Sequence, residues 1–333
     1  MKRVRKIDLL KGILVLQMVL GHCFQFFGDI ENVRWTANVV TYVNLMTFSG
    51  FLFCFGYVAN LVYLQQDFKR AVPKILKNVL RCLLAFYLSS FFYMIFVDGM
   101  ALRADKVLDI LLFRHLAGWS EFLLSFVLVM LMQIPLHLIL RKIPDWAVAL
   151  LMGISILATF LPKQDIYPLF ASVIDGRNGA FFPILQYSLY FYWGYLAAGH
   201  QKTPSRLLGL LPLAGTVYYL VSYVRTGVEP SRFPLSAAYL IGGAGLVYLW
   251  YCLASLLEEK EWKILRQVET VGKNSLWYLL LSNAVIFAVS STRFYRRSPW
   301  YALGLYVAIF LILPYVKSIY REEKHAIITS DCT

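Results

Sequence analysis

The chain consists largely of apolar segments, about ten of which are long enough to cross the roughly 30 Å hydrocarbon core of a membrane. Hydrophobic residues make up 59% of the 333 residues and charged residues only 15%, whereas soluble domains carry about 25% charged residues. Because a backbone in hydrocarbon must satisfy its own hydrogen bonds, such segments cross as helices. We therefore predict an all-α, polytopic membrane helix bundle. The expected spans lie near residues 7–27, 38–64, 72–97, 119–140, 145–161, 180–199, 206–224, 235–257, 274–292 and 300–319.

The spaces between these segments are too short to hold a soluble domain. We expect residues 1–333 to form a single membrane-embedded domain, with a short cytoplasmic tail from about residue 320. An amphipathic stretch near 105–115 is expected to lie in the membrane interface. The longest loop on the outer side, about 162–179, is long enough to act as a lid or a substrate loop.

The distribution of Lys and Arg predicts the orientation of the bundle. These residues are roughly twice as numerous in the loops on the N-terminal side as on the other side, which places both termini in the cytoplasm. The net charge of +13 then indicates contact with anionic membrane lipids, and no nucleic-acid partner is expected. Five scattered cysteines predict neither a disulfide framework nor a metal site: Cys23, Cys54, Cys82, Cys252 and Cys332.

The first apolar segment contains three ionisable side chains, although each costs about 2.5–3.5 kcal/mol or more at the bilayer centre. Asp8, Lys11 and His22 share one side of a helix, since Lys11 lies about 20° and Asp8 about 40° from His22 around the axis. Such a stripe is a functional-site hypothesis by default. For Lys11, snorkelling and an ion pair with Asp8 are alternative explanations.

Depth separates the two ends of this stripe. The helical rise places Asp8 at the inner membrane boundary and His22 about 21 Å further along, in the outer third. His22 therefore needs a partner from another span, and Glu121 begins the fourth span at a comparable depth. A histidine oriented by a carboxylate can act as a general base, so His22 and Glu121 are the candidate catalytic residues. Two alternatives stay open: Glu121 caps a helix, and His22 bridges two helices.

A second cluster of basic residues leads from an inner loop into the third span. Lys74, Lys77 and Arg81 share a helix face and are candidates to bind a phosphorylated ligand from the cytoplasm. For Lys74 and the basic residues before it, the ordinary excess of positive charge on the cytoplasmic side is a better explanation than ligand binding. Arg81 lies a turn or two inside the span and therefore needs a partner.

Further motifs accompany Asp8, Lys11 and His22 in chain order. They are Ser49-Gly50, Arg81-Cys82-Leu83-Leu84, Trp119, Gly194-Tyr195 and Gly272-Lys273-Asn274-Ser275-Leu276. In this order they resemble the acyltransferase-3 family of integral-membrane acyltransferases, in its stand-alone form, over nearly the whole chain. Ser282 and Asn283 stand where that family carries a late histidine, so no second catalytic histidine is expected.

The resemblance implies a membrane O-acyltransferase. Such an enzyme moves an acyl group, typically acetyl, from cytoplasmic acyl-CoA to a hydroxyl of a cell-envelope glycan or lipid-linked sugar in the bacterial cytoplasmic membrane. Acyl-CoA is then a substrate, and no tightly bound cofactor and no metal are expected. Asp8, Lys11, Lys77 and Arg81 would form the donor side, where cations hold the CoA phosphates. His22 would either deprotonate the acceptor or carry the acyl group.

Trp119, Arg34 and Arg177 are the candidate residues on the acceptor side. Lipid phosphate and plain solvation are the alternative roles of the two arginines. Two other functions also stay open. The chain is an exporter or translocase of a polysaccharide or lipid-linked glycan, or it is a structural subunit of a glycan synthase in which His22 is dispensable.

Overall fold

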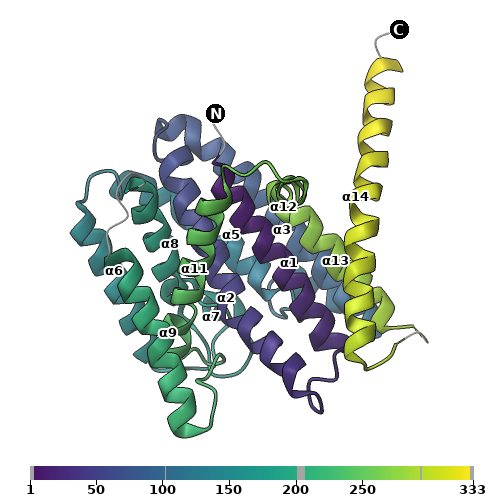
Figure 1. Ribbon diagram of the computed structural model, residues 1–333, viewed down its shortest axis with the longest axis horizontal. Coiled ribbons are helices and arrows are strands. Elements are labelled where there is room, and N and C mark those ends of the chain that lie inside the picture. Colours follow the sequence, from purple (N-terminus) through teal and green to yellow (C-terminus); the bar gives the residue numbers. More distant parts are fainter. Residues whose placement is uncertain (1–3, 102, 201–206, 293–294, 331–333) are drawn as a thin grey trace.

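The computed structural model describes residues 4–101, 103–200, 207–292 and 295–330. In these ranges every regular element is a helix, which confirms the predicted all-α bundle (Figure 1). A π-helical turn (Ala59–Tyr63) continues α2, and a 3₁₀ turn (Ala158–Phe160) continues α6. The helices are α1 (Arg5–Phe27), α2 (Arg34–Val58), α3 (Phe68–Phe96), α4 (Ala104–Leu111), α5 (Glu121–Ile139), α6 (Asp145–Leu157), α7 (Pro168–Ile174), α8 (Ile184–Gly199), α9 (Leu207–Thr226), α10 (Ala237–Gly242), α11 (Ala244–Leu257), α12 (Lys263–Lys273), α13 (Ser275–Ser290) and α14 (Pro299–Ser330).

Helices long enough to cross a membrane lie along the whole chain. Within the described ranges, 6 helices have the length and the apolar composition for a span. They are Arg5–Phe27, Arg34–Tyr63, Phe68–Phe96, Glu121–Ile139, Ala237–Leu257 and Pro299–Val316. Asp145–Phe160 and Ser275–Ser290 are shorter apolar helices, and the two other predicted spans coincide with α8 and α9.

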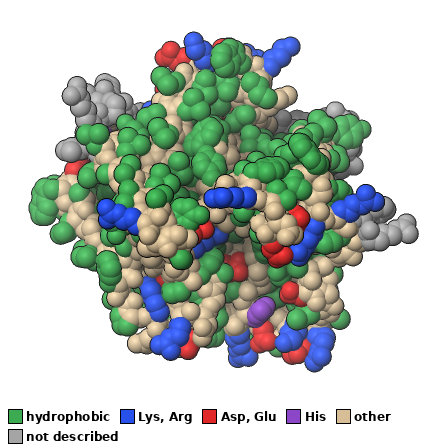
Figure 2. Space-filling model, turned by 60° about the horizontal axis from the view of Figure 1, so that its bottom comes forward, with side chains coloured by type: hydrophobic (Ala, Val, Ile, Leu, Met, Phe, Trp, Pro, Cys, Tyr) green, Lys and Arg blue, Asp and Glu red, His purple; other side chains and the backbone are tan. Residues whose placement is uncertain are grey.

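The flanks of the bundle are apolar, as contact with lipid requires. Figure 2 brings one end of the bundle forward and shows apolar side chains over the flank, with many charged side chains gathered toward that end. Helices α3, α6 and α9 contribute large exposed apolar side chains to the flanks, among them Leu80, Leu84, Leu88, Trp146, Leu150, Leu157, Leu210, Leu211 and Val224. This distribution supports a polytopic membrane protein.

Helix α1 lies inside the bundle, where it packs against α2, α11, α12, α13 and α14. Helix α2 packs mainly against α8, and α3 packs against α5. The α2–α8 contact depends on glycine, because a Cβ at Gly56 would lie 1.8 Å from the Phe191 carbonyl oxygen and one at Gly194 only 2.0 Å from that of Phe53. Small residues allow such close helix approaches in membranes. The Gly194-Tyr195 motif therefore has a packing role.

The structure changes three predicted elements and supports a fourth. The expected span 235–257 is present as Ala237–Leu257, but it divides at Gly243 into α10 and α11, and a Cβ at Gly243 would lie 2.2 Å from the Leu45 carbonyl oxygen. The outer loop 162–179 contains a helix, α7, and the region predicted as a tail continues α14. The amphipathic stretch near 105–115 contains α4.

The start of α1 and the end of α14 lie at the same end of the bundle (Figure 1). An even number of crossings requires this arrangement, so it agrees with the predicted placement of both termini on one side. Helix α12 packs against α1. That this side is cytoplasmic stays a prediction from the Lys and Arg distribution.

Candidate functional site

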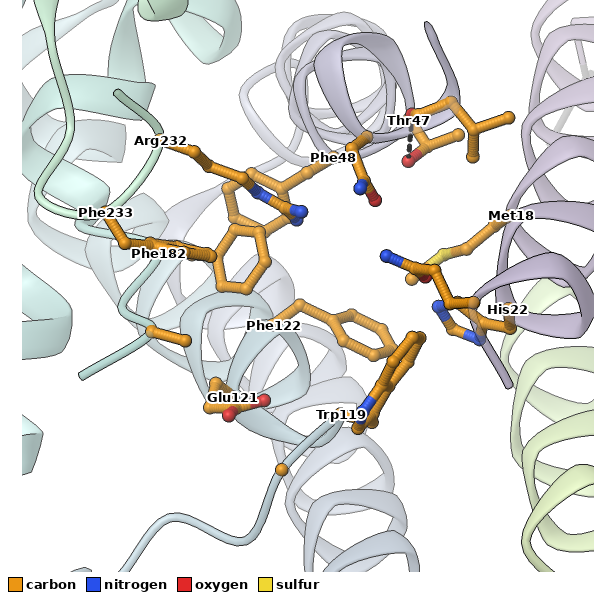
Figure 3. A pocket seen from close by; sticks show the side chains of 15 residues that line it. Met18, His22, Thr47, Phe48, Trp119, Glu121, Phe122, Phe182, Arg232 and Phe233 are labelled. Carbon is orange, nitrogen blue, oxygen red and sulfur yellow. Dashed lines mark hydrogen bonds between the residues drawn. The ribbon is translucent and has the colours of Figure 1, made fainter. Parts of the chain in front are cut away.

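The side chain of His22 lines a cavity of about 210 Å³ (Figure 3). Its walls come from α1, α2, the start of α5 and the loops that precede α8 and α10. We call it the His22 cavity. Trp119 and Glu121, both predicted from the sequence to act near His22, line the same cavity.

Asn283, on α13, holds the imidazole of His22. The Nδ1 atom of His22 lies 2.7 Å from the amide oxygen of Asn283, and the two side chains are 7% and 1% exposed. Because an amide oxygen only accepts hydrogen bonds, Nδ1 carries the proton and donates it, and Nε2 is left as the basic nitrogen. Asparagine also partners the catalytic histidine in some cysteine proteases. This tautomer is suited to accept a proton from a substrate.

Trp119 packs its ring against His22, with ring centroids 4.6 Å apart and planes at 87°. Its backbone has φ 67°, a left-handed conformation that costs a non-glycine residue about 1–2 kcal/mol. Ser120, the N-cap of α5, follows directly, and its hydroxyl lies 2.8 Å from that of Ser90 and donates to the Ala117 carbonyl. The turn before α5 is therefore anchored in a strained conformation that places the indole on the histidine.

Glu121 is the first residue of α5 and lies across the cavity from His22 in Figure 3. Its place in the first turn of α5 also suits the alternative explanation, because the helix dipole favours an acid there. No hydrogen bond among the described residues joins Glu121 to His22. Asn283 takes the orienting place at Nδ1 that the sequence analysis gave to Glu121, whose catalytic role stays a prediction.

Arg232, in the loop between α9 and α10, also lines the His22 cavity. Its guanidinium carbon lies 5.0 Å from the ring centre of Phe182 and 4.8 Å from that of Phe233, a favourable cation–π arrangement. Its Nε is buried and has no hydrogen-bond partner among the described residues. Asp175 fixes the loop by accepting the backbone N–H of Leu235 at 2.9 Å. Arg232 thus brings a positive charge to the wall of the cavity.

A second cavity, of about 840 Å³, lies between α1, α2, α3, α5 and the start of α13. Its lining includes Lys11, Arg81, Gln133 and Lys273, and we call it the Lys11 cavity. Lys11 Nζ lies 3.5 Å from Asp8 Oδ1, so the predicted ion pair is present. The side-chain oxygen of Gln133 is buried without a hydrogen-bond partner among the described residues.

The predicted donor and acceptor residues divide between these cavities and the surface. Lys11 and Arg81 line the Lys11 cavity. Asp8 is not part of the lining, but it forms an ion pair with Lys11. Lys77 is exposed and is not part of that lining. Arg34 and Arg177 are also exposed, and neither lines the His22 cavity, where Arg232 supplies the cation instead.

Helix α1 joins the two cavities, with Lys11 in one and His22 in the other. The separation along the helix axis is about 16 Å. The cavities have no lining residue in common. In the part of the chain that the structure describes, no three His, Cys, Asp or Glu side chains are grouped to hold a metal ion. The described cysteines Cys23, Cys54, Cys82 and Cys252 are free, and Cys332 lies outside the described residues.

Residues 3–211 match the model of the family described as "Heparan-alpha-glucosaminide N-acetyltransferase, catalytic". The chain belongs to this family. The matched range contains His22, Trp119 and Glu121, whereas Arg232 and Asn283 lie beyond it. Comparison of the chain with curated proteins and with solved structures gives no match.

Membership in this family supports a membrane enzyme of the acetyltransferase type, which is the general part of the function predicted from the sequence. The matching model is not that of the acyltransferase-3 family. The likeness to the acyltransferase-3 family stays a resemblance based on the order of short sequence motifs. An acyl-CoA donor is consistent with an acetyltransferase domain.

Proposed function

We propose that the protein transfers an acetyl group from acyl-CoA, bound in the Lys11 cavity, to an amino or hydroxyl group of a saccharide bound in the His22 cavity. The hydrogen bond between His22 and Asn283 carries the proposal, because it leaves Nε2 as a base beside a cavity. The family description favours an amino group, and the acyltransferase-3 resemblance favours a hydroxyl of a cell-envelope glycan or lipid-linked sugar. The bacterial cytoplasmic membrane is the proposed location.

In the proposed reaction, the acceptor atom attacks the thioester carbonyl carbon while Nε2 of His22 takes its proton. The carbon–sulfur bond then breaks, and CoA leaves as a thiolate that receives the proton from His22. Asn283 keeps the imidazole in the reactive tautomer throughout. Transient acetylation of Nε2 is a second route, which a burst of CoA release would reveal.

The two cavities suit two different ligands. Arg81 and Lys273 place cations in the Lys11 cavity, where they would attract CoA phosphates. Gln133 also lines this cavity and offers a side-chain amide to the amide groups of the pantetheine arm. On the other side, the guanidinium of Arg232, which lines the His22 cavity, would bind an anionic group of the acceptor.

The same geometry argues against the exporter. A translocated glycan would have to pass as a whole through the aromatic barrier between the two cavities, which have no lining residue in common. Transfer of an acetyl group needs only the thioester end of the donor to reach His22. The structural-subunit alternative makes the opposite prediction about His22, so one experiment tests all three functions.

That experiment compares two buried histidines. The purified protein in proteoliposomes receives radiolabelled acetyl-CoA together with glucosamine-terminated and neutral saccharides. We expect His22→Ala to lower the transfer rate about 10²–10⁴-fold, the usual contribution of a general base. The control is His137→Ala, because His137 is 2% exposed, bonds the Gln66 carbonyl at 3.0 Å and lines neither cavity. Unchanged transfer in His22→Ala, or glycan translocation without acyl-CoA, would contradict the proposal.

A further inference from the structure

A layer of phenylalanine side chains separates the two cavities. On α2, Phe48 lines the His22 cavity, whereas Phe51 and Phe55 line the Lys11 cavity. On α5, Phe122 lines the His22 cavity and Phe126 lines the Lys11 cavity. On each helix the change from one cavity to the other takes about one turn. The barrier is therefore about one ring thick.

Phe126 is the centre of this layer. Its ring stacks on that of Phe48 at 5.4 Å, with an interplanar angle of 3°. The rings of Phe51, Phe55 and Phe122 lie 5.7, 5.1 and 5.6 Å from it. Among the described aromatic contacts, the other four rings meet one another only through Phe126. A change in this one side chain therefore opens the layer.

The proposed reaction requires the thioester carbon to cross this layer. Phe48, Phe51, Phe122 and Phe126 are each 4% exposed or less, and buried cores of this kind leave little room for extra atoms. The acyl chain goes ahead of the thioester carbon, so every added methylene is one more group that must pass the rings and be held in the small His22 cavity, of about 210 Å³. The layer therefore discriminates by the length of the acyl chain.

We propose that Phe126 is a gate between the two cavities that restricts the transferred group to acetyl. The ring closes the passage in the conformation described here and must rotate to admit the acyl group. This inference rests on the proposed function, because it assigns the gate to the donor of that reaction. It adds a specificity-determining residue that does not contact the catalytic histidine.

The first test measures acyl specificity. Transfer rates from acetyl-, butyryl- and hexanoyl-CoA are compared for the wild type, Phe126→Ala and the milder Phe126→Leu. We expect Phe126→Ala to raise the butyryl-to-acetyl ratio about tenfold, within the range that methylene-sized pocket changes produce, and Phe126→Leu to raise it less. The control is Phe53→Ala, since Phe53 is 1% exposed, packs on Trp193 and Tyr251 and lines neither cavity. An unchanged ratio in both Phe126 variants overturns the gate.

The second test does not depend on transfer. The native cysteines are replaced by alanine, because Cys54 and Cys82 line the Lys11 cavity, and Met18→Cys places a thiol in the His22 cavity. A membrane-impermeant methanethiosulfonate reagent is added to sealed vesicles from the side of the Lys11 cavity. We expect labelling to be at least about tenfold faster with Phe126→Ala than without it, and unchanged with Phe53→Ala, because opening a closed layer changes access rather than reactivity.

These two tests separate the gate from the function. Equal labelling rates with and without Phe126→Ala overturn the gate, whatever the transfer assay gives. If Phe126→Ala speeds up labelling but no acyl-CoA supports transfer, the result contradicts the proposed function and leaves the gate in place. If Phe126→Ala both speeds up labelling and raises the butyryl-to-acetyl ratio, the result supports the gate and the proposed function.

Discussion

The His22 cavity and the Lys11 cavity hold their polar groups in different ways. In the His22 cavity, neighbouring side chains fix His22 and Arg232: Asn283 bonds the imidazole, Trp119 packs on it, and two aromatic rings flank Arg232. In the Lys11 cavity, Arg81 is exposed and the volume is about 840 Å³, against about 210 Å³ for the other. The first arrangement fixes atomic positions, as chemistry requires. The second attracts and accommodates a large anion.

The strongest way to test this comparison is to remove the partner of the imidazole. Asn283→Leu leaves His22 in place without control of its tautomer. We expect the catalytic rate constant for acetyl transfer to fall about 10²-fold with the KM for acetyl-CoA unchanged, because only proton transfer is affected. Steady-state kinetics at varied acetyl-CoA measures both constants.

The matched control is Asn60→Leu. Asn60 donates to the Tyr195 carbonyl at 2.8 Å and lines neither cavity. We expect its kinetics to match the wild type. Equal rate losses in both variants, or an effect of Asn283→Leu on KM alone, would mean that Asn283 supports the packing of α13 rather than the chemistry of His22.

The residues whose polarity is anomalous for a membrane span could be found from the sequence. Lys11 and His22 are recognisable because an ionisable side chain is costly in hydrocarbon, and the helical rise per residue gives their separation along α1. Each now lines a different cavity. Trp119 was found from the order of the motifs, and depth alone placed Glu121 near His22. The helical fold followed in the same way from hydrophobicity and segment length.

The partners of these residues could not be found in this way. Asn283 is 261 residues from His22 in the chain, so their contact depends on the packing of α13 against α1. An amide in an apolar span is a signal, because such groups bond across helices, but the sequence does not say which helix supplies its partner. Arg232 lies in a loop, where a cation is not anomalous, and its place in the cavity depends on cation–π contacts with Phe182 and Phe233 that form only in the folded chain.

A smaller effect is expected at the Lys11 cavity. Arg81→Gln removes one cation from a cavity that also contains Lys11 and Lys273. We expect the KM for acetyl-CoA to rise about tenfold with little change in the catalytic rate constant, as for loss of one charge-assisted contact to phosphate. Lys77→Gln, at an exposed residue outside the lining, should leave KM unchanged. Equal effects of the two substitutions would indicate general surface charge instead of a donor site.

The smallest expected effect concerns α12, which packs against α1 next to the Lys11 cavity. Glu269 accepts a hydrogen bond from Arg5 at 3.1 Å and pairs with Lys273. Burial raises the pKa of this carboxyl, but the contacts with Lys273 and Arg5 outweigh it, so the pKa is lowered from its ordinary value of 4.5. A lowered folded-state pKa stabilises the protein above the ordinary value, and this stabilisation is lost as the pH falls through the folded-state pKa.

We therefore expect Glu269→Gln to lower the stability of the purified protein by about 0.5–1 kcal/mol at pH 7, the range of partly exposed ion pairs. The difference from the wild type should shrink as the pH falls below about 4.5, where the wild-type carboxylate becomes protonated as well. Thermal unfolding in detergent across this pH range measures it. Glu261→Gln is the control, because the side chain of Glu261 is 65% exposed and should contribute less. A difference that persists unchanged at low pH would mean that Glu269→Gln acts on the packing of α12 against α1 rather than on this ion pair.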